Sequence, residues 1–392
     1  MIRRALRTSL AEAATHYPVV TLTGPRQSGK TTLCRAVFPD HAYVNLEAPD
    51  VRAFAREDPR GFLALHDEGV ILDEIQLVGE LVSYIQVLVD EDPRPGRFVL
   101  TGSQSLSVGD SVAQSLSGRT AVMHLLPPGR GELLEFPNCP QTLSETLFAG
   151  SYPRIFDRGI PPREWLADYV ATYVQRDVRQ ILNIVDLAPF TQFVRLLAGR
   201  TSGELNLSDL GSDAGVSHNT TRSWLSVLEA SFLVFRVPAF GANLRKRLTK
   251  APKVHFIDSG LACYLLGIEE PSQIATHPLR GALFESWVAS EVYKAHLHAR
   301  LEPWLSHARL TRGPEVDLVL EVGQRLHAIE TKSGSTIKGS FFDNLARFAG
   351  ELEQAGDPRE VMRRLVYGGD ERQKRTAGDA IPWSVLHELD WL

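Results

Sequence analysis

The segment Thr21–Leu33, which reads TLTGPRQSGKTTL, constrains the fold of this chain more than any other feature. Two glycines separated by four residues, followed by Lys and Thr, form the pattern of a phosphate-binding loop between a strand and a helix. Glycines let the backbone curl so that several N–H groups point at phosphate oxygens, and the helix start adds its positive dipole. The alternative is an ordinary glycine turn beside an exposed lysine. We favour the phosphate-binding loop because a β-rich run precedes it and a helical pattern follows it.

The loop predicts its ligand and the role of each polar residue. We expect the Lys30 ammonium to reach the β- and γ-phosphates and the Thr31 hydroxyl to ligate Mg²⁺. Arg26, inside the loop, can also contact phosphate. The expected nucleotide-binding residues are Gly24, Pro25, Arg26, Gln27, Ser28, Gly29, Lys30, Thr31 and Thr32. The expected ligands are therefore ATP or ADP together with Mg²⁺.

Composition limits the class of protein. The chain has 392 residues, of which 43% are apolar, and this is enough for two or three hydrophobic cores. The three cysteines follow no metal-ligand or disulfide pattern. We find no apolar run of membrane-spanning length and no signal-peptide core, so we expect a cytoplasmic protein without membrane contact. A net charge of −5 excludes a chain that is basic throughout but leaves room for local basic patches.

Apolar runs and helical patterns alternate along residues 1–130, which predicts a parallel sheet with helices on both faces. In the run VILDEIQ, Asp73 and Glu74 come at the carboxyl end of a buried strand, where ligands of open α/β sheets lie. We expect Asp73 to hold Mg²⁺, directly or through water, and Glu74 to act as general base on the attacking water. The alternative is that two acids simply end a strand at the surface.

A second strand end supplies further polar groups. The run RFVLTGSQ offers Thr101, Ser103 and Gln104 to sense the γ-phosphate or to position water, and we choose Ser103 as a catalytic residue. A turn-forming TGS sequence explains the same residues almost as well.

The motifs together resemble a widespread prokaryotic family of AAA-type ATPases whose C-terminal half is a domain of unknown function. The resemblance rests on LTGPRQSGKTTL, VILDEIQ, RFVLTGSQ and SLSGRT, and continues in SYPRIF, LRGALFESWVASE and EVDLVLE. It implies ATP binding and ATP hydrolysis. Many AAA-type ATPases present an arginine finger from a place like that of Arg119, so the resemblance also implies a catalytic Arg119 that acts on the nucleotide of its own chain or, in a homo-oligomer, on that of a neighbour. The alternative for Arg119 is a solvated side chain.

The middle of the chain predicts a helical lid and a winged helix. A short helix meets a turn at Gly215, Ser217 caps a second helix, and a strand follows, which is the spacing of a helix-turn-helix. The outer face of the second helix and the basic run after it can contact DNA phosphates and base edges. The expected DNA-contacting residues are His218, Asn219, Thr220, Arg222, Arg245, Lys246 and Arg247. The alternative is a module that only packs against protein.

Near the C-terminus, four residues resemble the motif of the PD-(D/E)xK nuclease superfamily. Glu285 lies on an expected long helix over 279–297, Asp317 on one strand, and Glu330 and Lys332 on the next. In such nucleases carboxylates hold one or two Mg²⁺ ions against the scissile phosphate, and the ammonium orients water. The alternative is a salt-bridged scaffold in which Lys332 pairs with Asp317 and Glu330.

We therefore expect an α/β chain with three parts: an AAA-type P-loop ATPase domain over residues 1–148, a helical lid and winged helix over 149–258, and a nuclease-like α/β domain over 259–392. The expected function is Mg²⁺-dependent ATP hydrolysis, with the nucleotide state controlling the downstream domains and DNA as a candidate partner. The catalytic residues are expected to be Glu74, Lys30, Ser103 and Arg119. The alternative is a nucleotide-controlled DNA-binding or defence regulator that hydrolyses little ATP and carries a non-catalytic nuclease-like scaffold.

Overall fold

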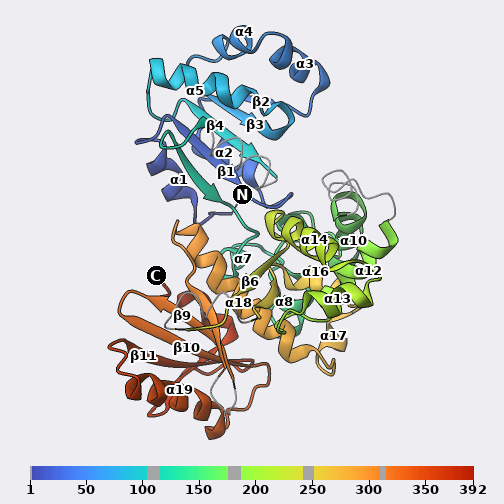
Figure 1. Ribbon diagram of the computed structural model, residues 1–392, viewed down its shortest axis with the longest axis vertical. Coiled ribbons are helices and arrows are strands. Elements are labelled where there is room, and N and C mark those ends of the chain that lie inside the picture. Colours follow the sequence, from blue (N-terminus) through green and yellow to red (C-terminus); the bar gives the residue numbers. More distant parts are fainter. Residues whose placement is uncertain (1, 104–114, 175–186, 242–250, 310–314) are drawn as a thin grey trace. The chain divides into compact units, whose positions relative to one another are not determined.

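The computed structural model describes residues 2–103, 115–174, 187–241, 251–309 and 315–392 (Figure 1). These residues form two compact units. Unit 1 comprises residues 1–128, 230–232 and 297–301, and unit 2 comprises residues 129–229, 233–296 and 302–392. The division into three parts expected above remains a prediction.

Unit 1 is built on a five-stranded sheet in which all neighbouring strands are parallel. Its order is β2 (Ala42–Asn45), β3 (Val70–Asp73), β4 (Phe98–Gly102), β1 (Val19–Thr23) and β5 (Thr120–His124). Every residue of β1 is buried, because this β-branched, apolar run lies between β4 and β5. The parallel sheet expected from the alternating pattern is confirmed.

Helices cover both faces of this sheet. They are α1 (Arg7–Ala13), α2 (Lys30–Val37), α3 (Pro49–Glu57), α4 (Pro59–Ala64), the 3-10 turn η1 (Ile75–Val78) and α5 (Leu81–Glu91). Because side chains alternate along a strand, Val70 and Leu72 join the core cluster that includes α5, while Ile71 joins the cluster that includes α1 and α2. The sheet is therefore a middle layer with one core on each side.

One part of unit 2 is helical and combines segments that precede α13 (Leu207–Asp213) with two that follow β7 (Lys253–Phe256). Its helices are α7 (Arg130–Leu133), α8 (Leu143–Ala149), α9 (Pro153–Asp157), α10 (Pro162–Tyr169), the π-helical turn η2 (Val170–Val174), α12 (Leu187–Ala198), α16 (Ser259–Leu265) and α17 (Pro271–Ile274). Tyr152, Trp165 and Tyr169 are buried together, with ring centroids 4.7 to 5.0 Å apart. These rings form a core of the helical part.

A helix-turn-helix arrangement follows. Helix α13 (Leu207–Asp213) leads through Gly215, which has a φ of 70°, into α14 (His218–Ala230). The antiparallel strands β6 (Val234–Val237) and β7 (Lys253–Phe256) come next. On Gly211 a Cβ would lie 2.5 Å from Thr221 Oγ1, so only glycine permits this close approach of the two helices.

The C-terminal part of unit 2 is a six-stranded mixed sheet. Its order is β12 (Gln373–Arg375), β13 (Gly378–Pro382), β11 (Glu360–Tyr367), β10 (Arg325–Lys332), β9 (Glu315–Val322) and β8 (Leu305–Arg309). Helix α19 (Asp343–Gln354), with the 3-10 turn η3 (Gly339–Phe342), packs Leu345 and Phe348 on one face of the sheet, and the turn η4 (Trp383–Glu388) follows β13 (Figure 1). The long helix α18 (Arg280–His298) begins and ends one residue later than the expected helix.

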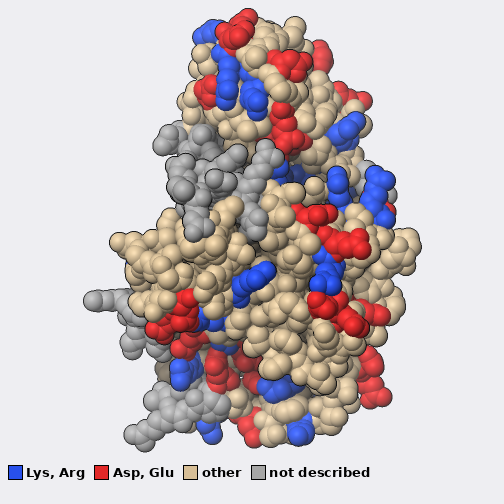
Figure 2. Space-filling model, turned by 90° about the vertical axis from the view of Figure 1, so that its right-hand side faces the viewer, with Lys and Arg blue, Asp and Glu red and all other residues tan. Residues whose placement is uncertain are grey.

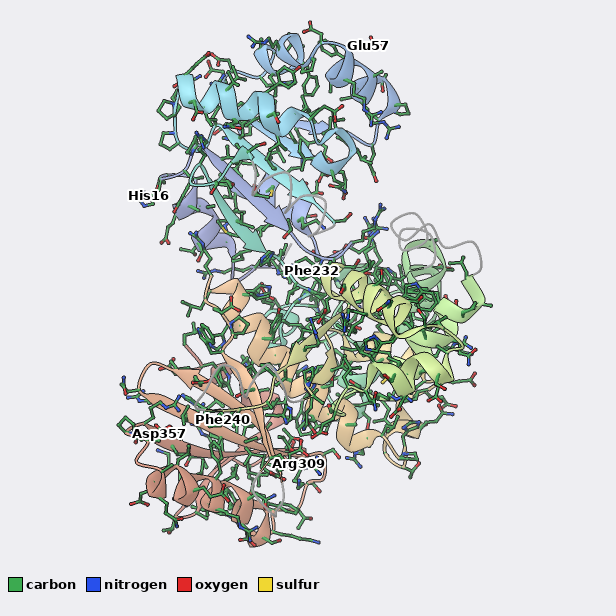
Figure 3. The ribbon with its side chains drawn as sticks, viewed as in Figure 1. His16, Glu57, Phe232, Phe240, Arg309 and Asp357 are labelled. Atoms are coloured by element: carbon green, nitrogen blue, oxygen red, sulfur yellow. The ribbon has the colours of Figure 1, made fainter. Side chains whose placement is uncertain are left out.

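Half-buried ion pairs lie beside the C-terminal sheet. Figure 3 labels Phe240 and Asp357, and Arg359 joins them: its guanidinium donates to Asp357 at 2.6 Å and lies 5.7 Å from the Phe240 ring. Acidic and basic side chains are interspersed on the face shown in Figure 2.

In the described part of the chain, every helix is too short or too polar to cross a membrane.

The helix-turn-helix packing gives a first prediction. Replacing Gly211 by Ala forces a methyl group against Thr221 and the Val216 carbonyl, so we expect a loss of about 1–3 kcal/mol in the free energy of unfolding. Gly281→Ala is the matched control, because this helical glycine has open space around it and Ala favours a helix. Urea unfolding of the two variants measures the difference. Equal midpoints would contradict the close approach of α13 and α14.

Candidate functional site

The phosphate-loop pattern forms a tight turn between β1 and α2. Gly24 has a φ of 151° and Gly29 a φ of 97°, values that glycine adopts readily. A Cβ on Gly24 would lie 2.2 Å from the carbonyl oxygen of Leu125, the residue after β5. The first glycine is therefore required both by the backbone conformation and by the contact with the neighbouring strand.

Lys30 folds back into the loop. Its ammonium donates to the carbonyl oxygens of Gly24 and Pro25 at 2.9 and 3.0 Å, and only 5% of the residue is exposed. Burial lowers the pKa of Lys30, while the nearby Glu74 and Asp73 carboxylates act in the opposite direction. The loop thus encloses a cation whose hydrogen-bond partners are neutral carbonyls.

Arg4 holds the loop through hydrogen bonds to backbone carbonyls, a role that was not predicted from the sequence. Its guanidinium donates to the carbonyl oxygen of Ser28 at 2.7 Å and to that of Leu126 at 2.6 Å. Arg4 is buried and lies outside the phosphate-loop pattern, so no local signal points to this contact. It links the middle of the loop to the segment after β5.

Asp73 accepts hydrogen bonds from three hydroxyl groups. Thr31 Oγ1 and the Tyr43 hydroxyl donate to Oδ2 at 2.8 Å each, and Thr101 donates to Oδ1. The structure therefore brings Thr31 and Asp73 together as expected, whereas the contribution of Tyr43 from β2 was missed. Burial, followed by the hydrogen bond to Asp73, raises the pKa of Tyr43.

Glu74, the residue after β3, has a φ of 59°, which is strained for a side chain of this size. Its Oε2 accepts a hydrogen bond from Ser103 Oγ at 3.0 Å and another from Gln76 Nε2. Ser103 thus lies beside Glu74, and its catalytic role remains a prediction. Gln76 was missed, although it stands in the same VILDEIQ run, and Gln104 lies outside the described residues.

Arg119 lies at the edge of the sheet where β1 begins, opposite the edge that carries the phosphate-binding loop. Its carbonyl accepts from the amide of Val19, where β1 begins, whereas the phosphate-binding loop follows the end of β1. Its guanidinium donates to both carboxylate oxygens of Asp90, at 2.5 and 2.9 Å. A role at the site of a neighbouring subunit remains a prediction.

The loop fits a triphosphate with Mg²⁺. The buried hydroxyl oxygen of Ser28 has no hydrogen-bond partner among the described residues, and the first N–H groups of α2 have no acceptor within the helix. Since the Thr31 hydroxyl donates its hydrogen bond to Asp73, the Thr31 oxygen keeps its lone pairs for a metal ion. Hydroxyl and carboxylate oxygens are the ligands that Mg²⁺ prefers.

The four nuclease-motif residues of unit 2 lie in one cluster. Lys332 pairs with Glu330, and Asp317 accepts from the amide and the hydroxyl of Thr331 at 2.8 Å each. The β9–β10 register ends at Leu318 and Ile329, and beyond this last pair the Asp317 carboxylate turns toward Thr331. Burial, followed by Asp317, raises the pKa of Glu285 and raises that of Glu330 to about 7.

As the described residues stand, no three His, Cys, Asp or Glu side chains are grouped so that they could hold a metal ion. Instead, Lys253 of β7 donates to Glu285 at 2.7 Å. The sequence analysis did not include Lys253, which stands 32 residues before Glu285. The nuclease-like fold itself remains a prediction.

The expected DNA-contacting residues fall into two groups. On α14, His218, Asn219 and Arg222 are exposed, and Thr220 is half-buried with its hydroxyl 2.9 Å from that of Ser217. Trp224 and Leu228 of the same helix are buried. Arg245, Lys246 and Arg247 lie outside the described residues. Contact with DNA remains a prediction for both groups.

Comparisons with protein families divide the chain into three matched segments. Residues 16–134 match the AAA domain. Residues 140–272 and 280–386 match two domains of unknown function, DUF8612 and DUF4143. The match of the N-terminal part supports a P-loop, nucleotide-binding domain of AAA type. The other two matches assign no activity.

Curated relatives share most of the chain but are themselves uncharacterized. One protein of Mycobacterium tuberculosis and one of Mycobacterium bovis are each 29% identical over 339 residues, which cover 85% of this chain and 74% of the relative. An uncharacterized protein of Methanocaldococcus jannaschii is 21% identical over 271 residues, covering 61% of this chain and 60% of the relative. These relatives name no reaction or partner.

Solved structures show weaker likenesses. A Walker-type ATPase of Pyrococcus abyssi aligns with 66% of this chain and 94% of its own, at 15% identity and a TM-score of 0.45. AMPPCP-bound DnaA from Aquifex aeolicus aligns with 57% of this chain and 85% of its own, at 12% identity and a TM-score of 0.30. Likenesses of this size say nothing about function.

The Arg4 contact gives a second prediction. Arg4→Met removes two hydrogen bonds from buried carbonyls, so we expect a loss of about 1–3 kcal/mol in the free energy of unfolding and weaker nucleotide binding, because the loop loses its support. Arg7→Met is the control, since the exposed Arg7 makes only a 3.4 Å contact with Ala36. Denaturant unfolding and titration with a fluorescent ATP analogue provide the measurements. If Arg4→Met and Arg7→Met behave alike, Arg4 does not support the loop.

Proposed function

We propose that this protein binds ATP with Mg²⁺ through residues 24–32 and hydrolyses it. The observation that carries the proposal is the convergence of Lys30, Asp73 and Glu74 at one edge of the sheet of unit 1. Thr31 connects the loop to Asp73, and Ser103 connects the end of β4 to Glu74. A triphosphate in the loop would therefore meet a cation, a metal-binding pair and a base in one place.

Lys30, Thr31 and Asp73 would each have a separate task in binding Mg·ATP. The Lys30 ammonium exchanges the carbonyls of Gly24 and Pro25 for oxygens of the β- and γ-phosphates. A charged phosphate oxygen accepts a stronger hydrogen bond than a neutral carbonyl does. The hydroxyl of Thr31 and, directly or through water, the carboxylate of Asp73 would hold Mg²⁺, which when bound offsets charge on the phosphate oxygens.

Glu74 would act as the general base. Its carboxylate would accept a proton from the attacking water, while hydrogen bonds from Ser103 and Gln76 hold Oε2 in place. The strained backbone of Glu74 is consistent with a position fixed by function. In a homo-oligomer, Arg119 would leave Asp90 and contact the nucleotide of the neighbouring subunit.

Steady-state hydrolysis tests the proposal. Glu74→Gln keeps the size of the side chain but removes the base, so we expect hydrolysis to fall by a factor of about 10²–10⁴ while ATP binding persists. Glu57→Gln is the control, because Glu57 is an exposed acid at the end of α3 (Figure 3). Phosphate release with Mg·ATP is the measurement. A wild-type protein that binds ATP without Glu74-dependent turnover would be a nucleotide-controlled switch instead.

Unit 2 offers a second candidate function, the binding of duplex DNA controlled by the nucleotide state. The observation that favours it is the exposed polar face of α14, which follows a tight turn and precedes the β6–β7 pair. His218, Asn219 and Arg222 can contact phosphates and base edges from this helix, and the adjoining strands would form a wing.

Salt-dependent DNA binding tests this second function. Arg222→Ala removes one phosphate contact, so we expect weaker duplex binding and a salt dependence whose slope falls by about one. Arg163→Ala is the matched control, because it removes the same charge from an exposed arginine of α10 that pairs with Glu269. Fluorescence anisotropy from low to moderate salt gives both values. Equal curves for the two variants would exclude α14 as the contact surface.

A further inference from the structure

Lys253 lies in the middle of the nuclease-like carboxylate cluster. It is the first residue of β7, and only 4% of its side chain is exposed. Its ammonium lies 2.7 Å from Glu285 Oε1 and 2.5 Å from Glu315 Oε1. A buried ammonium with two carboxylate partners is a strongly held cation.

The remaining acids of the cluster also have partners within the chain. The Asp317 carboxylate turns its Oδ2 to the amide and hydroxyl of Thr331. Glu330 is buried, and its Oε1 accepts from Lys332. Its Oε2 has no hydrogen-bond partner among the described residues. The cluster therefore holds four carboxylates, those of Glu285, Glu315, Asp317 and Glu330, against the two ammonium groups of Lys253 and Lys332.

We propose that Lys253 is the resident cation of this cluster and stands in place of the divalent metal that a PD-(D/E)xK nuclease would bind. Mg²⁺ requires near-octahedral oxygen ligands at 2.0–2.1 Å, and the Lys253 ammonium already takes one oxygen of Glu285 and one of Glu315. A metal ion would have to displace a tethered, buried charge that the chain itself supplies. The C-terminal sheet is accordingly a scaffold that takes no metal at this place.

The charge states support this assignment. Burial alone would lower the pKa of Lys253, but Glu285 and Asp317 outweigh that effect and raise it. Burial, followed by repulsion from Asp317, raises the pKa of Glu285, and the ammonium opposes this shift. Lys253 thus offsets negative charge that the cluster could otherwise neutralise only by binding protons or a cation.

The ammonium also has a structural task. It joins β7, which pairs with the strand after α14, to α18 and to β9. These elements come from distant parts of the sequence, and removing one partner of a buried pair leaves the other uncompensated. The cluster is therefore a point of attachment between the β6–β7 pair and the C-terminal sheet.

Counting bound Mn²⁺ on the full chain without nucleotide tests the proposal. We expect the wild-type protein and the Asp317→Asn variant to bind the same amount of Mn²⁺. Lys253→Met removes the charge but keeps the length of the side chain, so we expect this variant to gain about one Mn²⁺ per chain. The double variant Lys253→Met/Asp317→Asn should lose that ion again, and Lys253→Arg, which keeps the charge, should not gain it. The paramagnetic signal of free Mn²⁺ gives the count.

Two results overturn the proposal: Asp317-dependent Mn²⁺ binding by the wild type, or a folded Lys253→Met variant that gains no ion. Circular dichroism establishes folding. If Lys253→Met does not fold, Lys253→Met/Glu285→Gln removes the ion pair as a unit and leaves Glu315, Asp317 and Glu330 as ligands. The same gain of Mn²⁺ is expected there, and its absence equally overturns the proposal. None of these results depends on ATP hydrolysis by unit 1.

Discussion

The carboxylate of Asp73 is the interaction on which the nucleotide site depends. It is buried at the end of β3, where an unpaired charge would be costly, and it is satisfied by hydroxyl groups from Thr31, Tyr43 and Thr101. Hydrogen bonds to a charged acceptor contribute about 1.5–3 kcal/mol each. Because the donors stand on α2, β2 and β4, one carboxylate fixes the helix start and two strands relative to β3. The orientation of the phosphate-binding loop follows from this.

Lys30 of unit 1 and Lys253 of unit 2 are both buried, but their hydrogen-bond partners differ in charge. Lys30 donates to neutral carbonyls, so a ligand with charged oxygens offers it better partners and can replace them. Lys253 contacts carboxylates, so an incoming ligand has nothing stronger to offer, and an incoming metal ion meets a like charge. The same side chain therefore suits a binding site in one unit and a permanent attachment in the other.

The sequence predicted what is encoded locally. Residues 21–33 lie together in the chain, and the buried strand before Asp73 could be recognised from its apolar run, so the loop, the parallel sheet and the approach of Thr31 to Asp73 were all foreseen. The helix-turn-helix spacing around Gly215 was equally readable, because turn and capping residues act over a few positions.

Contacts between distant residues were missed. Arg4 reaches carbonyls 24 and 122 residues away, and Tyr43 reaches Asp73 across 30 residues. Lys253 lies outside the motif that pointed to Glu285 and Asp317, although it decides which cation that cluster holds. Such contacts depend on how elements pack in three dimensions, and a single sequence carries no signal for a lysine that arrives from β7, a strand outside the sheet of β9 and β10.

Calorimetric titration of Mg·ATP into the full chain tests the central claim most directly. The account predicts saturable heat with about one site per chain, lost in Lys30→Ala and retained in Lys253→Met, because the loop of unit 1 alone holds the triphosphate. No heat with the wild-type protein, or heat that survives Lys30→Ala, would contradict it.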